Sequence, residues 1–144
     1  FATACADRYA LARAGEPLSA QRRTADHLAT MRAEAHRQSQ PGLTDEAFCA
    51  SDVAFHRALV DAAGNPVLSY QLAGAVEAMQ PLMNMITFSA RDRERIIGLH
   101  TQIADALEAK DGLAADENLA SLAAYTQEIA QDVIAKRNAA RDQK

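Results

Sequence analysis

The chain has 144 residues and a net charge of −4, with two Cys, no Trp, six Gly and four Pro. This length suits a single domain that folds without a disulfide or a metal. Gly and Pro together make up about 7% of the residues, below the usual ~12%, which favours long helices over a β-sandwich or barrel. The apolar share of 49% argues against intrinsic disorder, and the mild acidity argues against a strong nucleic-acid binder.

Targeting signals are absent from the printed sequence. No apolar run approaches the ~18 residues of a membrane-spanning helix, and no basic segment followed by an apolar one opens the chain. Cys5 and Cys49 fit free thiols in a reducing compartment better than a disulfide framework. We therefore expect a cytoplasmic protein without membrane association. Because the chain begins with Phe1 rather than Met, we also expect it to be a piece of a longer protein.

The first half of the chain predicts three helices. The opening segment is helical by composition, and Pro17 either bends that helix or starts a new one. Thr24 is a good N-cap for a second helix, which ends near Gln38. Thr44 caps a third helix, and Gly64 ends it. Asn65 can then cap the next helix, and Pro66 fits its first position.

The second half predicts three more helices, over about 66–85, 93–109 and 114–137. Pro81 should kink the first of them, the run Lys110-Asp111-Gly112 should stop the second, and the residues from Asn138 on should fray. Short connections give antiparallel neighbours. The sequence therefore predicts an all-α, antiparallel bundle of about six helices.

Three polar residues fall on predicted inward faces. Asp52 and His56 are four residues apart, so they share the face of their helix that also carries Phe55. His100 lies among isoleucines on the inward face of the fifth helix. Buried carboxylates and imidazoles must pair or bind something, and metal sites in bundles are built from ligands on facing helices. The set suits a divalent ion such as Zn²⁺, Ni²⁺, Mn²⁺ or Fe²⁺.

Two other interpretations of these residues stay open. Asp52 and His56 could simply pair with each other, with His100 a core histidine that has its own partner. One Asp and two His can also form the facial triad of a non-haem iron oxygenase. That triad usually sits in a β-barrel, and no acid–base or co-substrate motif accompanies it here, so we expect no enzymatic activity.

Structural roles can explain the other candidate residues, which are a methionine, a tyrosine, two histidines and three arginines. Met79 fits the core but also suits an adaptable pocket wall. Tyr125 falls on the inward stripe of the last helix, where a buried hydroxyl needs a partner. His27 and His36 are expected at the surface of the second helix. A solvated face, or a contact with an anion, is expected for Arg91, Arg93 and Arg95.

Two blocks of sequence, in this order and at this separation, carry a family resemblance. They are DVAFHRALVDAAGNPVL at residues 52–68 and LHTQIADALEAKDGLAA at residues 99–115. Both resemble signatures of the effector-binding C-terminal (FCD) domain of FadR-type regulators in the GntR family, and RRTADHLATMRA at residues 22–33 resembles its second helix. The resemblance covers nearly the whole chain and implies an antiparallel bundle of six to seven helices.

The resemblance also implies a metal centre. Many members of this family hold a divalent metal through one Asp and three His, and the carboxylate of the effector completes the coordination. On this chain the Asp is Asp52 and the first two histidines are His56 and His100. The third histidine aligns with Tyr125, so the site either has three protein ligands or lacks the metal and binds the effector through Tyr125.

Further effector contacts are implied on other helices. The family often has an arginine on the first helix, which is Arg8 in one alignment, whereas another alignment places Ala12 there. We add Met79 as a candidate effector contact. The acidic residue that often precedes the second histidine is Leu99 here, another departure from the pattern.

The expected function is therefore that of a ligand-sensing domain in a GntR/FadR-type bacterial transcription regulator. It would bind a small carboxylate metabolite, such as a sugar acid or lactate, and shift the population of helix arrangements. A homodimer would pass this change to a winged helix-turn-helix domain that is absent from this chain and makes the only DNA contacts. The alternative is a purely structural helical dimerisation module without metal or effector, which no such ligand would stabilise.

Overall fold

The computed structural model describes residues 10, 13, 19–75 and 90–142, and these form helices and no strand. Four helices have defined bounds, namely α2 (Ala25–Gln38), α3 (Asp45–Asp61), α5 (Arg93–Glu108) and α6 (Gly112–Asp142). Residues 19–22 and 66–75 are helical as well. The all-α fold class is confirmed. Several predicted features lie outside the described residues, namely Cys5, Arg8, Ala12, Pro17, Met79 and Pro81.

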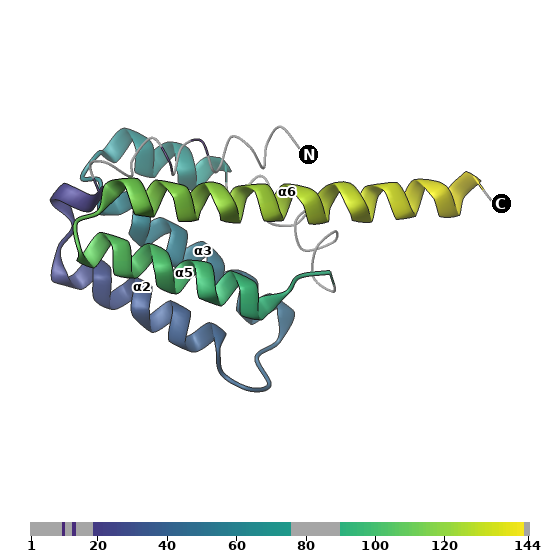
Figure 1. Cartoon of the computed structure of the whole chain (residues 1–144), viewed down its shortest axis with the longest axis horizontal. Helices are drawn as coiled ribbons and strands as arrows, with labels where there is room; N and C mark the ends of the chain where they lie inside the picture. Colours follow the sequence, from purple (N-terminus) through teal and green to yellow (C-terminus); the bar gives the residue numbers. More distant parts are fainter. Residues whose placement is uncertain (1–9, 11–12, 14–18, 76–89, 143–144) are drawn as a thin grey trace.

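The helices pack as a bundle in which α2 contacts both α3 and α5, and α5 contacts α6 (Figure 1). The connection between α5 and α6 is short, so the two helices run antiparallel. With 31 residues, α6 is about 46 Å long. Its C-terminal part extends beyond the other helices (Figure 1).

Polar side chains begin α2, α3 and α5 as helix caps. Thr24 Oγ1 accepts from His27 N, and the His27 ring accepts in return from Thr24 N, which makes a capping box. Thr44 Oγ1 accepts from Ala47 N at 3.2 Å. Both threonine caps are confirmed, and α2 ends at Gln38 as predicted.

The corner after α3 forms by the predicted local chemistry. α3 itself ends at Asp61, and a turn follows. Gly64 has a φ of +62°, a left-handed value that costs glycine little. The side chain of Asn65 then accepts from Val67 N at 3.1 Å, and helical structure resumes at residue 66.

α5 ends at Glu108, just before the run Lys110-Asp111-Gly112, as predicted, but the residues of that run have other roles than expected. Lys110, and not a glycine, adopts the left-handed conformation, with a φ of 60°. Asp111 Oδ1 accepts from Ala114 N at 3.0 Å, so it acts as a helix-starting residue, and Gly112 opens α6 rather than stopping α5. The expected fraying from Asn138 is also wrong, because α6 continues to Asp142.

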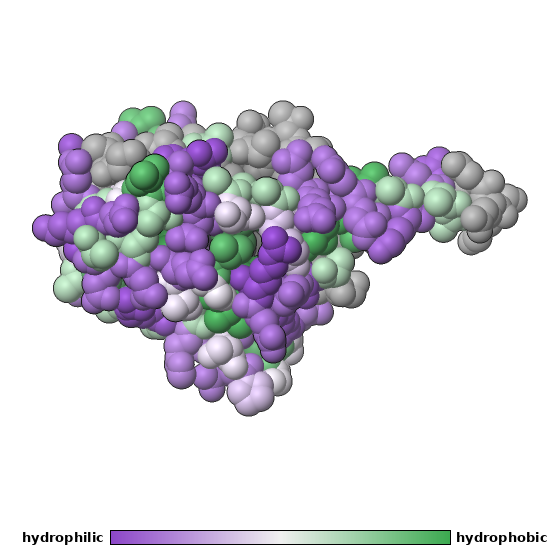
Figure 2. Space-filling model, in the orientation of Figure 1, coloured by the Kyte–Doolittle hydropathy of each residue, from purple (hydrophilic) through white to green (hydrophobic). Residues whose placement is uncertain are grey.

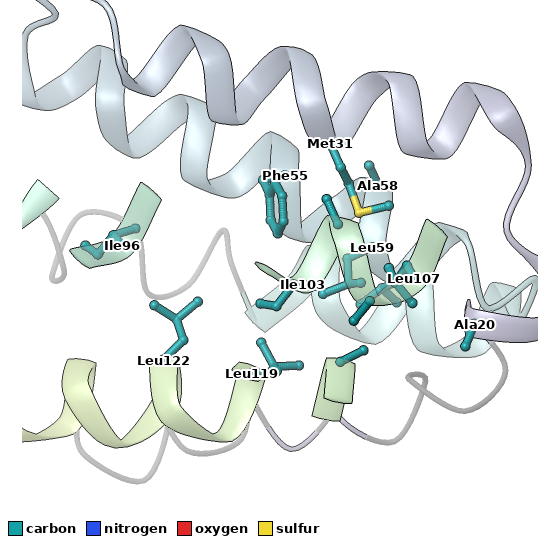
Figure 3. Packing of buried hydrophobic residues seen from close by; sticks show 14 of the residues in the cluster. Ala20, Met31, Phe55, Ala58, Leu59, Ile96, Ile103, Leu107, Leu119 and Leu122 are labelled. Atoms are coloured by element: carbon teal, nitrogen blue, oxygen red, sulfur yellow. The ribbon is translucent and has the colours of Figure 1, made fainter. Parts of the chain in front are cut away.

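The core lies where α2, α3, α5 and α6 meet (Figure 3). Met31 of α2, Phe55 of α3, Ile103 of α5 and Leu119 of α6 are each fully buried there. Burial of one such side chain stabilises the fold by about 1.5–3 kcal/mol. The visible outer face is mostly hydrophilic (Figure 2), so the helices present their polar sides to solvent.

The predicted solvated arginine face is wrong for Arg91 and Arg93, which are half-buried. Arg93 donates to Leu43 O at 2.7 Å, forms an ion pair with Asp45, and lies 5.0 Å from the centre of the Phe48 ring. It therefore ties the start of α5 to the start of α3. These contacts explain a cation in the first turn of a helix, where the helix dipole alone disfavours one.

Candidate metal centre

The three polar residues with inward predicted faces meet at one point inside the bundle. Asp52 and His56 come from α3, one turn apart, and His100 comes from α5. Asp52 Oδ1 lies 3.4 Å from His100 Nε2 and 3.8 Å from His56 Nε2. The side chains are buried, with 6% of Asp52 and none of either histidine exposed. One potential ligand atom from each lies within 4.8 Å of those of the other two.

The apolar surroundings and a polar neighbour hold the ring of His100. Phe55 stacks on it, with ring centres 4.0 Å apart and planes 16° apart. Gln38, the last residue of α2, places Oε1 2.8 Å from His100 Nδ1. Both ring edges of His100 thus face polar groups, Gln38 on one side and Asp52 on the other.

The donor set of this cluster fits a divalent metal ion. Ligand atoms bound to one ion at about 2.0–2.2 Å lie about 3–4 Å from each other, as the Asp52 oxygen and the histidine nitrogens do. Two imidazoles and one carboxylate suit a borderline ion. The 3.8 Å separation of Asp52 Oδ1 and His56 Nε2 exceeds the length of a direct hydrogen bond but is within the range of an ion pair.

Helix α6 contributes apolar side chains to the core around Phe55. Leu119 and Leu122 of α6 belong to the same buried cluster as Phe55 (Figure 3). Among the described residues, no fourth histidine, cysteine or carboxylate joins the group. Three protein ligands leave a position for an external ligand, as in open metal sites.

Tyr125 is buried as predicted, but its hydroxyl lies elsewhere. It accepts from Asp92 N at 2.7 Å, at the first turn of α5, two turns before His100. Arg95 covers its ring at 4.2 Å. The described contacts of Tyr125 thus join α6 to the start of α5, and they do not bring its hydroxyl to the histidines.

A buried thiol lies one turn before Asp52 on α3. Burial raises the pKa of the Cys49 thiol, the negative charges of Asp52 and Asp45 raise it further, and Arg91 opposes the rise. Arg91 donates to Cys49 Sγ at 3.1 Å. Cys49 is a free cysteine, as the sequence predicted.

Sequence reasoning missed Gln38 and Arg91 as neighbours of the site. Gln38 is polar and ends a helix, which is where a solvated residue is ordinarily expected. Arg91 precedes α5 in a run of charged residues. No local pattern signals either contact, because each depends on how separate helices pack.

Comparison with known protein families matches the chain to the FCD domain over residues 6–139. The chain belongs to the FCD family. The match confirms the resemblance to the C-terminal effector-binding domain of GntR-family regulators, and it does not specify the FadR subfamily. No curated protein matched the chain.

FCD membership makes this a ligand-sensing regulatory domain of transcription regulators, a class of proteins that are not enzymes. Such regulators bind small-molecule effectors and reach DNA through a partner domain. Among the residues that the structure describes, no helix has both the length and the apolar character that crossing a membrane requires.

Proposed function

We propose that this FCD domain senses a small carboxylate metabolite through a divalent metal held by Asp52, His56 and His100. The observation that supports it most is the burial of one carboxylate and two imidazoles from two helices at one point. Ionised or strongly polar groups in a core carry a desolvation cost, which a bound cation would offset.

The charge balance of the site favours an anionic effector. Two neutral histidines and one carboxylate would leave a bound dication with a net positive charge inside the bundle. When bound, the metal would supply a Lewis-acidic position that takes a carboxylate oxygen. A ligand held there contacts α3 and α5 together, so it would favour one arrangement of these helices over others.

Metal analysis of the purified chain tests this proposal. After removal of metal with a chelator, wild type is expected to bind Zn²⁺ or Ni²⁺ close to one per chain. The His100→Ala variant should lose most of that binding, whereas His36→Ala, an exposed histidine of α2, should not. Bound metal at 100 times its Kd would add about 2.7 kcal/mol to the free energy of unfolding.

The effector class is tested next on the metal-loaded domain. Lactate and gluconate are expected to raise the melting temperature further in wild type and to have no effect in Asp52→Ala, which keeps no carboxylate for the metal. Absence of bound Zn²⁺, Ni²⁺ and Mn²⁺ in wild type would contradict the proposal. It would favour the structural dimerisation module instead.

A further inference from the structure

Gln38 occupies a position that the stability of the bundle does not explain. The residue is only 2% exposed at the end of α2, and its Nε2 has no hydrogen-bond partner among the described residues. A buried amide group without a partner costs about 1–3 kcal/mol. A methionine of similar length would avoid that cost and fill the same space.

Among the described residues, the one hydrogen bond of the Gln38 side chain is with His100 of the candidate metal centre. Its Oε1 lies 2.8 Å from His100 Nδ1, and both atoms are buried. A carbonyl oxygen only accepts hydrogen bonds, so Nδ1 must carry the proton. In the neutral ring Nε2 then presents a lone pair, and it faces Asp52 Oδ1 at 3.4 Å.

The opposite tautomer would defeat metal binding. A proton on Nε2 would point at the position between His100 and Asp52 that a cation must occupy. Phe55 stacks on the face of the ring and limits its rotation, but a stacked ring does not distinguish the two nitrogens. A group at the ring edge can select the tautomer, and two acceptors lie there: Gln38 Oε1 is 2.8 Å from Nδ1, within hydrogen-bond distance, whereas Asp52 Oδ1 is 3.4 Å from Nε2.

We propose that Gln38 is a positioning residue of the metal centre, which holds His100 as the Nδ1–H tautomer with its Nε2 lone pair directed at Asp52. This inference rests on the proposed metal binding. Outer partners of this kind raise the basicity of a ligating histidine, and their removal typically weakens metal binding about 10–100-fold.

Three variants test the assignment. Gln38→Met removes the acceptor and is expected to weaken Zn²⁺ binding about 10–100-fold in competition with a chelating dye. Gln38→Glu restores an acceptor for Nδ1–H and is expected to bind Zn²⁺ at least as tightly as wild type. The control is Ser51→Ala, which removes another buried hydrogen bond to α2, from Ser51 Oγ to Glu34 O, and should leave Zn²⁺ affinity near wild type.

The metal-free protein supplies a second readout that loss of packing alone would not produce. In ¹⁵N-histidine NMR, the His100 resonances are assigned by their disappearance in His100→Ala. Wild type at neutral pH should show the Nδ1–H pattern, and Gln38→Met should shift towards the Nε2–H pattern while Ser51→Ala does not.

The proposed metal binding and the role of Gln38 would be contradicted by different results. Wild type that binds no Zn²⁺ overturns the proposed function. Wild type that binds Zn²⁺ with an affinity unchanged in Gln38→Met, or with His100 in the Nε2–H form, overturns the assignment of Gln38 alone. Equal weakening in Gln38→Met and Gln38→Glu overturns it too, because a carboxylate can accept the same hydrogen bond.

Discussion

Phe55 is both a core residue and a neighbour of the proposed metal centre. Its ring stacks on His100 and meets the ring of His56 edge-on, with centres 5.7 Å apart. The same side chain is completely buried in the cluster that holds the four helices together. The packing of the bundle and the geometry of the centre are therefore linked through one aromatic ring.

Replacement of Phe55 should separate stability from metal binding when it is compared with Phe48. Phe55→Leu and Phe48→Leu each shrink a buried ring, so each should lower the free energy of unfolding by about 1–2 kcal/mol in urea titrations. Only Phe55→Leu should also weaken Zn²⁺ binding, because the ring of Phe55 stacks on His100, whereas the ring of Phe48 lies under Arg93. Equal Zn²⁺ affinities in the two variants would contradict this role of Phe55.

At the scale of the helices, ion pairs between side chains join elements that are far apart in the chain. Arg13 binds Asp116 of α6 through two hydrogen bonds, of 2.7 and 2.8 Å. Arg32 of α2 pairs with Asp105 and Glu108 of α5. These pairs are exposed, so each contributes little on its own, but the two-bonded geometry of Arg13 and Asp116 is the more favourable.

The ion pair of Arg13 and Asp116 predicts that the free energy of unfolding depends on pH. The Arg13 guanidinium lowers the pKa of the Asp116 carboxyl below its ordinary value of 3.8. Ionised Asp116 therefore stabilises the fold above that value, and the stabilisation disappears as the pH falls through the lowered pKa of the folded state. The difference in unfolding free energy between wild type and Asp116→Asn should be full near about pH 6 and should decline below about pH 4.

The Arg13→Ala background is the control for this measurement. Without the guanidinium, Asp116→Asn should no longer change the pH profile of urea unfolding in the acid range. A pH-dependent difference that persists in Arg13→Ala would assign the effect to another group.

At the scale of the helices, the features that the sequence could predict are those formed by residues close together in the chain. Thr24, Thr44 and the Gly64–Pro66 corner act through neighbours in the chain, so their chemistry was visible without the fold. The inward faces of Asp52, His56 and His100 followed from helical spacing for the same reason.

Features that depend on packing between helices could not be predicted in this way. Gln38 contacts His100 only because α2 and α5 lie side by side, and nothing near Gln38 in the sequence signals that contact. The Tyr125 hydroxyl reaches Asp92 because of the relative shift of α5 and α6 along their axes, which helical spacing does not determine. Lys110 takes a conformation usually assigned to glycine, although a glycine, Gly112, lies only two residues later.

At the scale of the whole molecule, the proposed metal centre would join three of the helices. α3 carries two of the candidate ligands, α5 carries one, and Gln38 of α2 contacts the ring of His100. A ligand bound at this point would act on more than one helix, because the candidate ligands come from both α3 and α5. In the proposed function, a small molecule of few contacts would in this way favour one arrangement of the helices over others.

The burial of Cys49 gives the protein an internal reporter of its own opening. The thiolate is the form that reacts with alkylating and disulfide reagents, and here the thiol is buried with a raised pKa. In a Cys5→Ser background, labelling of Cys49 should therefore proceed through transient separation of α3 from the segment around Arg91. Added Zn²⁺ should slow the labelling of wild type but not of His100→Ala, and equal slowing in both would place the cation elsewhere. The rate of Cys49 labelling would then report how readily the metal-free protein opens around this thiol.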